Sequence, residues 1–522
     1  MHLRRLASLL AFVPSALLAA LLVAPLATPL AAQQPLVGTW QGTLDAGPAK
    51  LRLAFHVTLR DGALHATLDS IDQGAEGLPV DEVTLLDGAV HFAMPRLGAT
   101  FDGTLDADGA RIVGEFRQGT ALPLTLAKVE RADAVVVPKR PQHPAPPFPY
   151  RCEDVTFAHT PAGAGAPIRL AGTLTLPEGP GPFPAAVLIS GSGPQDRDET
   201  LLGHKPFLVL ADDLTRHGFA VLRYDDRGTA KSTGDHATAT SLDFADDARA
   251  AVRFLRARPE IDGDRVGLIG HSEGGLIAPI VAAGADEGDG GTRDGGTRDG
   301  GTRDGGTRDG GTGDRGTGDR GNEVAFVVLL AGPGVNGREI LRVQSAAIAR
   351  AEGMTDEDIA ASAGIDEQVY DAIEAATDDA ALAKELHAIG ERAWTEASES
   401  ARAQLGSAAA LHAQIARAAT PWFRCFLTHD PAAVLRRVRC PVLAMNGALD
   451  LQVVPAQNLP AVEAALKAGV CEDITCVELP GLNHLFQECG TGAPSEYQAI
   501  EQTFAPAALA TLRDWLLARF AK

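Results

Sequence analysis

Several signatures of metal and cofactor chemistry are missing from this sequence of 522 residues. It has no H-E-x-x-H segment and no pair of C-x-x-C segments, so no metal site is predicted. It also lacks the G-x-x-x-x-G-K-[ST] loop that cradles phosphates, so no cofactor is implied. Basic residues are scarce, because 46 Lys and Arg stand against 67 Asp and Glu, for a formal net charge of −21. Since affinity for a phosphate backbone comes from Lys and Arg, we expect no nucleic-acid partner.

Length and composition indicate a folded chain with more than one domain. A chain of 522 residues is too long for one ordinary hydrophobic core, so at least two units are expected. Hydrophobic residues make up 45% and charged residues 22%, which is ordinary for a globular protein. Disorder should therefore be local.

The first 32 residues are typical of a secretory signal peptide. Arg4 and Arg5 precede an apolar stretch, residues 6–32, that ends in small residues. This stretch is long enough to span a bilayer, so an uncleaved membrane anchor is the alternative. Prolines interrupt it, which favours the signal peptide. We expect an exported protein, periplasmic or secreted, with no stable membrane insertion after signal cleavage.

Export would place the cysteines in an oxidising compartment, where disulfides form. Cys471 and Cys476 are near neighbours and are the first candidates for a pair, with buried free thiols as the alternative. Sequence alone does not fix the pairing. The six cysteines are Cys152, Cys425, Cys440, Cys471, Cys476 and Cys489.

Residues 36–130 predict an antiparallel β domain. Short runs of alternating apolar residues are separated by Asp-Gly dipeptides, for example Asp87-Gly88 and Asp108-Gly109, which suit tight hairpin turns. A small barrel or lipocalin-like sheet would close the edges. The domain would either bind a ligand or serve as a packed accessory domain, and the second reading is favoured because no polar cluster stands out.

Two segments of biased composition divide the chain. Residues 131–150 contain the run PKRPQHPAPPFP, whose fixed φ angles predict a stiff, extended linker. Residues 286–321 contain repeated GTRDG units with no apolar face to bury, so they predict a solvated, flexible insertion without a catalytic role.

From residue 151 to 522 the pattern changes to apolar strands that alternate with helices. The clearest helix is 242–256, in which Phe244, Ala248 and Leu255 lie on one face. This alternation predicts a doubly wound, mostly parallel α/β sheet covered on both sides. Residues 334–430 are rich in Ala and charged residues, and they predict a helical cap over the active site.

The motif Gly270-His271-Ser272-Glu273-Gly274 is the centre of the predicted chemistry. It follows the apolar strand RVGLIG and opens a helix, which is the strand–turn–helix setting of a nucleophile elbow. The glycines leave room for a strained turn that projects the hydroxyl. Ser272 is therefore the predicted nucleophile, and a turn that only packs a helix on a strand is the alternative.

A serine nucleophile needs a base and an acid that orients the base. In this fold the expected chain order is Ser, then the acid, then His. Asp450 follows the strand PVLAMNG, and His484 is the single histidine after Asp450. Glu478 is the substitute acid. The oxyanion of acyl transfer would be held by the backbone N–H of Glu273 and of Ser192, with Gly191 as the neighbouring alternative to Ser192.

Several motifs of the sequence, in the expected order, resemble those of the bacterial α/β-hydrolase carboxylesterases that are distantly related to serine aminopeptidases. The resemblance covers about residues 150 to 520 and implies a capped esterase for short acyl esters, often preceded by a β domain. Ala230 departs from it, since the family usually has glycine there, and so does the GTRDG tract. The motifs are GSGPQDRDE (191–199), RYDDRGTAKSTG (223–234), GHSEGG (270–275), TPWFRCFLTHDP (420–431), CPVLAMNGALDLQV (440–453) and LPGLNHLFQ (479–487).

The sequence therefore predicts a serine hydrolase that acts on a small-molecule ester through an acyl-enzyme. One alternative is an aminopeptidase or amidase, in which a cap carboxylate such as Glu339 or Asp366 would hold the substrate's α-ammonium group. Another is an exported ligand-binding protein on a degenerate hydrolase fold. The sequence does not indicate the oligomeric state.

Overall fold

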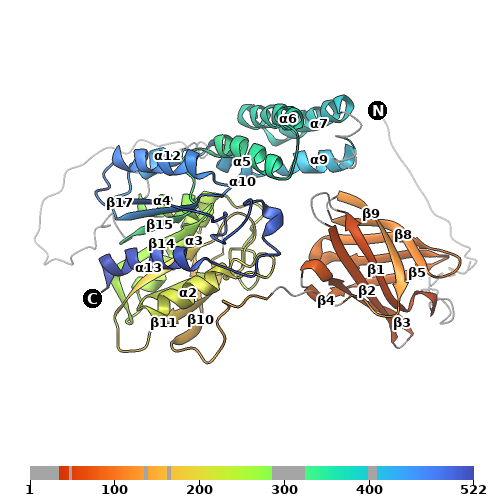
Figure 1. Cartoon of the computed structure of the whole chain (residues 1–522), viewed down its shortest axis with the longest axis horizontal. Coiled ribbons are helices and arrows are strands. Elements are labelled where there is room, and N and C mark those ends of the chain that lie inside the picture. The colour runs from red at the N-terminus through yellow and green to blue at the C-terminus, as the bar shows by residue number, and fades with distance from the viewer. Residues whose placement is uncertain are drawn as a thin grey trace, which may run out of the picture.

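The computed structural model has a β domain, an α/β domain and a layer of helices above the latter (Figure 1). It describes residues 34–521 except for 46–49, 61, 74, 119, 134–138, 162–165, 285–323, 398–401 and 403–407. The expected signal peptide and the GTRDG insertion lie outside the described residues. Among the described residues, no helix combines the length and the apolar character needed to cross a bilayer.

The N-terminal domain is a nine-stranded antiparallel sheet in the order β4-β3-β2-β1-β9-β8-β7-β6-β5. All strands that are consecutive in sequence pair except β4 and β5, and β1 also pairs with β9, so the sheet curls into a barrel that is open between β4 and β5. The strands are β1 (Gly38–Asp45), β2 (Lys50–Arg60), β3 (Ala63–Ser70), β4 (Ala75–Val80), β5 (Glu82–Leu86), β6 (Ala89–Met94), β7 (Ala99–Leu105), β8 (Arg111–Gln118) and β9 (Thr120–Val129).

The barrel is built on the alternation that the sequence predicts, since the inward positions carry its hydrophobic core. Phe55 stacks on Phe92 with ring centroids 4.6 Å apart, and Phe101 lies 5.9 Å from Phe92. The alternating pattern of the sequence does not predict β4 and β5, the two edge strands. Gly77 and Pro79 in β4 are residues that strands usually avoid, and an edge position tolerates them.

The proline-rich segment is not a free spacer, because residues 139–150 lie against the α/β domain. Arg140 donates hydrogen bonds to three backbone carbonyls of the α/β domain, those of Leu202, Gln498 and Ile500. Gln142 donates to the carbonyl of Phe504 at 2.6 Å, and its amide oxygen accepts from the backbone N–H of Thr503 and Phe504. The linker expected to be extended is therefore docked on the segment that precedes the last helix.

The α/β domain contains an eight-stranded sheet in the order β10-β11-β13-β12-β14-β15-β16-β17. The first two pairings, β10–β11 and β11–β13, are antiparallel, and all later ones are parallel. The strands are β10 (Arg151–His159), β11 (Ile168–Leu176), β12 (Phe183–Ile189), β13 (Ala220–Tyr224), β14 (Ile261–His271), β15 (Val327–Leu330), β16 (Val442–Gly447) and β17 (Ile474–Leu479).

Helices cover both faces of this sheet, which confirms the predicted doubly wound class. On one face pack α3 (Ser241–Arg256), α4 (Gly274–Ala282), α11 (Pro431–Leu435) and α12 (Pro455–Lys467). On the other pack α2 (Pro206–Arg216) and α13 (Pro506–Phe520). Helix α3 begins at a capping box, in which the Thr240 hydroxyl and the Asp243 carboxylate satisfy each other's backbone N–H groups.

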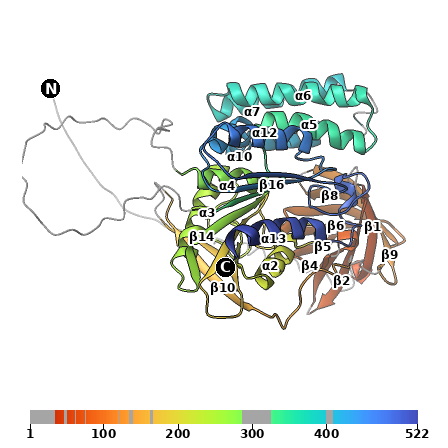
Figure 2. The same cartoon turned by 60° about the vertical axis from the view of Figure 1, so that its left-hand side comes forward.

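The cap consists of helices that leave the sheet after β15 and return before β16. They are α5 (Gly337–Ala351), α6 (Asp356–Ala375), α7 (Asp379–Glu396), α9 (Ala408–Ala416) and α10 (Pro421–Thr428). Buried side chains such as Ile373, Leu386 and Leu427 give the cap a hydrophobic core of its own. The cap forms a separate layer over the sheet in Figure 2, and α9 also contacts β9 of the barrel.

All six cysteines are free thiols, so the expected Cys471–Cys476 disulfide is absent. Cys471 is buried, and its thiol donates to the carbonyl of Cys440 at 3.3 Å. Cys476 lies on β17, where it is paired with Ala444 of β16. The alternative of free thiols is the one that this structure contains.

Candidate active site

Ser272 sits at the tight turn between β14 and α4, in backbone geometry that side chains normally avoid. Its φ is +52°, in the left-handed region. The flanking glycines are required by contact, since a Cβ on Gly270 would lie 1.9 Å from the carbonyl oxygen of Gly274. A Cβ on Gly274 would lie 2.1 Å from the carbonyl oxygen of Ile189. The turn is therefore the strained elbow that the sequence predicts, with Ser272 at its tip.

His484 and Asp450 form a buried pair. The imidazole Nδ1 of His484 donates to Oδ2 of Asp450 at 2.9 Å, and the two residues are 3% and 1% exposed. Asp450 also accepts from the backbone N–H of Gln452 and Val453 and from the Asn446 side chain. These donors fix the carboxylate, and the carboxylate in turn fixes the tautomer and direction of the imidazole.

The loop that carries His484 is joined directly to the elbow. His271, the residue before Ser272, lies with its ring centroid 4.8 Å from that of His484, and its Nε2 is 3.1 Å from the His484 carbonyl oxygen. The structure thus brings Ser272, His484 and Asp450 to one edge of the sheet. Glu478, the substitute acid, is exposed on β17, and it is Asp450 that bonds His484.

The loop after β12 faces the elbow and carries the candidate oxyanion donors. A Cβ on Gly191 would lie 3.2 Å from the Cβ of Ser272. The Gly191 N–H already donates to Oε1 of Glu199 at 2.7 Å, so it is not free to hold an oxyanion. Among the described residues, the hydrogen bonds include none from the Ser192 or Glu273 amide. These are the two amides that the sequence predicts to hold the oxyanion.

Two acidic residues at the end of β13 hold this loop in shape. Asp226 accepts from the Ser190 hydroxyl at 2.8 Å and from the Gln195 N–H at 3.0 Å. Asp225 accepts from Arg197 through two guanidinium nitrogens at 2.8 and 3.0 Å. Burial raises the pKa of Asp226, and the donors from Gln195 and Ser190 oppose that rise. These residues belong to the segment RYDDRGTAKSTG (223–234), for whose residues the sequence alone predicts no role.

Ala230, at a position where the sequence resemblance leads us to expect glycine, has a strained backbone. Its φ is +47°, a left-handed conformation that glycine adopts without strain. The alanine holds this turn at some cost in strain, which a glycine at this position would avoid.

Glu199 and His271 form a second buried carboxylate–histidine pair beside the first. His271 Nδ1 lies 2.9 Å from Oε1 of Glu199, while its Nε2 faces the carbonyl of His484. Burial lowers the pKa of His271, but the charge and hydrogen bond of Glu199 outweigh burial and raise it. Both ring nitrogens face acceptors, so a protonated ring donates to both and joins the loop after β12 to the loop that carries His484.

The carboxylate of Glu273 connects the elbow to the cap. It is 2% exposed and accepts from the Ser241 hydroxyl at 2.6 Å and from the indole N–H of Trp422, on α10, at 2.8 Å. Burial raises the pKa of Glu273, and the donors from Ser241, Trp422 and Ser192 oppose that rise. A cap side chain therefore bonds the residue whose own amide is a candidate oxyanion donor.

We expect Trp422→Phe to lower the free energy of unfolding by about 1–2 kcal/mol, because the buried Glu273 carboxylate loses one donor. The phenyl ring keeps the stacking on Phe426, where the indole now lies at 5.4 Å and 7°. Urea denaturation followed by residual enzymatic activity measures the change. Trp394→Phe, in the same cap, is the matched control, and an equal loss in both variants would contradict the role given to the Glu273 bond.

Comparison with known proteins agrees with this geometry. Residues 205–289, which include α2, β13, α3 and the elbow, match the family described as serine aminopeptidase, S33. Together with the sheet order and the strained serine turn, this match decides the architecture. The C-terminal domain has the α/β-hydrolase fold.

Two curated relatives of this chain are enzymes. Esterase EstD of Thermotoga maritima is 39% identical over 113 residues, which cover 22% of this chain and 27% of the esterase. Human acyl-coenzyme A thioesterase 1 is 33% identical over 117 residues, which cover 22% of this chain and 24% of the thioesterase. The chain thus spans about a quarter of the length of these relatives.

The matches to solved structures cover more of the chain, at lower sequence identity. An esterase of Pyrococcus furiosus covers 74% of this chain and 98% of its own, with a TM-score of 0.39 and 14% identity. The α/β hydrolase GrgF from a Penicillium species covers 71% of this chain and 100% of its own, with a TM-score of 0.39 and 16% identity.

The two cap carboxylates that could hold an α-ammonium group lie in different surroundings. Asp366 lines a pocket inside the cap with Tyr370, Arg342 and neighbours on α5 and α6, and burial raises the pKa of Asp366. Glu339 is exposed near the start of α5. Asp366 and Asp450 line different pockets among those described, and Glu339 lines neither of these two.

Proposed function

We propose that this protein is a serine hydrolase that cleaves short-chain carboxylic esters through an acyl-enzyme intermediate. The observation that carries the proposal is the buried His484–Asp450 pair, joined through His271 to the strained turn of Ser272. A relative named esterase, matched over 113 residues, supports an ester substrate. A thioesterase relative is consistent with the same acyl chemistry.

In the proposed mechanism, His484 takes the proton of the Ser272 hydroxyl as the oxygen attacks the ester carbonyl carbon. The amides of Glu273 and Ser192 hold the negative charge that develops on the carbonyl oxygen. His484 then gives its proton to the leaving alcohol, which departs and leaves an acyl-serine. Water, deprotonated by His484, releases the acid and restores Ser272. Asp450 stays ionised and stabilises the imidazolium throughout.

The second candidate is an aminopeptidase or amidase, and the matched serine aminopeptidase family favours it. That activity requires an anionic group that pairs with the substrate's α-ammonium within reach of Ser272. Asp366 lines a pocket inside the cap and Glu339 is exposed on α5, and no described contact joins either carboxylate to Ser272. The relative named esterase therefore makes ester cleavage the first proposal.

The test compares acyl esters with aminoacyl arylamides, after a fluorophosphonate probe has reported an activated serine. We expect labelling of the wild type at Ser272, and turnover of p-nitrophenyl acetate at a kcat/KM at least tenfold above that of the arylamides. The reverse preference would establish the aminopeptidase. Failure of labelling, together with binding of a ligand, would establish a non-catalytic binding protein.

We also propose that the protein is exported, to the periplasm or beyond the cell. Arg4 and Arg5 ahead of the apolar stretch support this. The N-terminal sequence of the mature protein, recovered from the extracytoplasmic fraction, tests it.

A further inference from the structure

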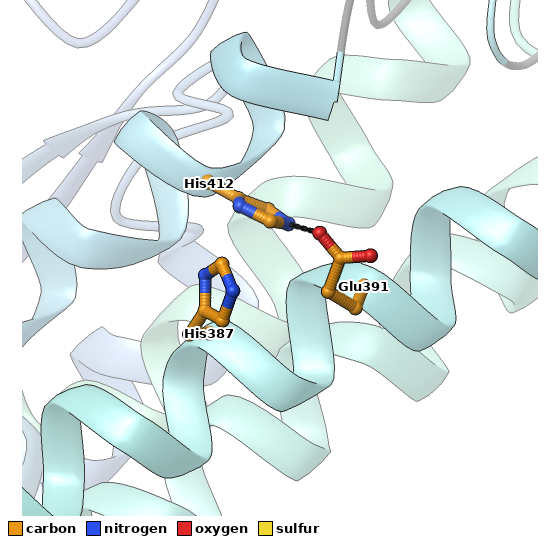
Figure 3. A group of neighbouring side chains, drawn as sticks. All are labelled: His387, Glu391 and His412. Atoms are coloured by element: carbon orange, nitrogen blue, oxygen red, sulfur yellow. Dashed lines mark ion pairs between the residues drawn. The ribbon is translucent and has the colours of Figure 1, made fainter.

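Two histidines and a glutamate converge between two helices of the cap. His387 and Glu391 lie one turn apart on α7, and residues at this spacing share a helix face. His412 reaches them from α9. Figure 3 shows the His412 ring above the two side chains that rise from α7. One ligand atom from each residue lies within 4.8 Å of the other two.

The spacing of two of these atoms is that of ligands to one ion. His412 Nε2 and Glu391 Oε1 are 3.3 Å apart. Nε2 is buried and forms no hydrogen bond with a described residue. In a tetrahedral zinc site with bonds of about 2.0–2.1 Å, neighbouring nitrogen and oxygen ligands are about 3.3 Å apart. His412 Nε2 thus stands at ligand spacing from Glu391 Oε1, its ion-pair contact in Figure 3, without a hydrogen-bond partner among the described residues.

The backbone of α7 is shaped to receive the His412 ring. A Cβ on Gly390 would lie 2.5 Å from Cδ2 and 3.0 Å from Nε2 of His412. Glycine is among the least favourable residues inside a helix, yet it occupies an interior position of α7 here. The glycine lets the imidazole approach close enough for Nε2 to face Glu391.

We propose that His387, Glu391 and His412 bind a divalent transition-metal ion, with Zn²⁺ as the ion that two imidazoles and one carboxylate suit best. Three protein ligands leave one position for water. His387 and Glu391 are exposed, so the ion can enter from solvent. The third ligand comes from a second helix, which is why the site matches no metal motif in the sequence. The bound ion links α7 to α9 and stabilises the cap.

The experiment uses the full-length protein without a histidine tag, stripped with EDTA and titrated with Co²⁺. We expect visible absorption from Co²⁺ in a low-symmetry site, saturating at one equivalent and lost when Zn²⁺ displaces the cobalt. Zn²⁺ should also raise the melting temperature.

Three variants test the ligands separately. His412→Ala and Glu391→Gln should weaken cobalt affinity by at least the 10–100-fold typical of disturbed metal sites. His387→Ala alters an exposed side chain, so it keeps the fold intact and should show the same loss. His65→Ala, an exposed histidine on β3, is the matched control and should bind as the wild type does. Equal cobalt binding by all four variants, or none by the wild type, would overturn the proposal.

Discussion

Replacement of Ser272 by alanine should reduce kcat for p-nitrophenyl acetate by on the order of 10⁶-fold, while KM changes little. In the proposed mechanism the Ser272 hydroxyl forms the acyl-enzyme, so its loss removes the covalent path. Residual catalysis above the rate in water would come from the oxyanion amides and substrate binding. Steady-state kinetics together with fluorophosphonate labelling measure the effect.

The control for this variant is Ser362→Ala, which removes an exposed hydroxyl from the cap. It should keep full activity and full labelling. Alanine also adopts a left-handed φ at a cost similar to that of serine, so Ser272→Ala should fold as the wild type does. An active, normally folded Ser272→Ala protein would remove the nucleophile from the proposed mechanism.

Replacement of His484 by alanine should lower kcat by a similar factor, on the order of 10⁶-fold, because the serine then has no base. The double variant Ser272→Ala/His484→Ala should lose no more than either single variant, since the two residues act as one unit. Asp450→Asn should lose less, on the order of 10⁴-fold, because the imidazole remains but its tautomer is no longer held.

Added imidazole supplies the check on His484→Ala. A diffusible base should restore part of the lost activity in that variant and none in Ser272→Ala. If the double variant lost far more than either single variant, the two side chains would act independently, and a different base would have to be sought.

The proposed triad residues could be predicted from sequence because each leaves a local signal. Ser272 lies in a glycine turn between a strand and a helix, and the clashes at Gly270 and Gly274 show why only glycine fits there. His484 is the single histidine after Asp450, so chain order leaves no competitor. The α/β class followed from apolar strands and the amphipathic helix that the structure places at Ser241–Arg256.

The residues that hold the site in shape could not be found this way, because their partners are distant in sequence. Glu199 bonds His271 across 72 residues, and Trp422 bonds Glu273 across 149. The sequence around a carboxylate does not indicate which distant group will donate a hydrogen bond to it. The edge strand β4 was missed for a related reason, since Pro79 argues against a strand unless the edge position is known.

The docked segment ahead of β10 changes where the α/β-hydrolase domain can be cut free. A fragment that begins at Arg151 would lose Arg140 and Gln142 and would leave the carbonyls of Leu202, Gln498, Ile500 and Phe504 without these donors. A fragment that begins at Lys139 would retain all of them. The smallest autonomous hydrolase unit therefore starts inside what composition alone would discard as a spacer.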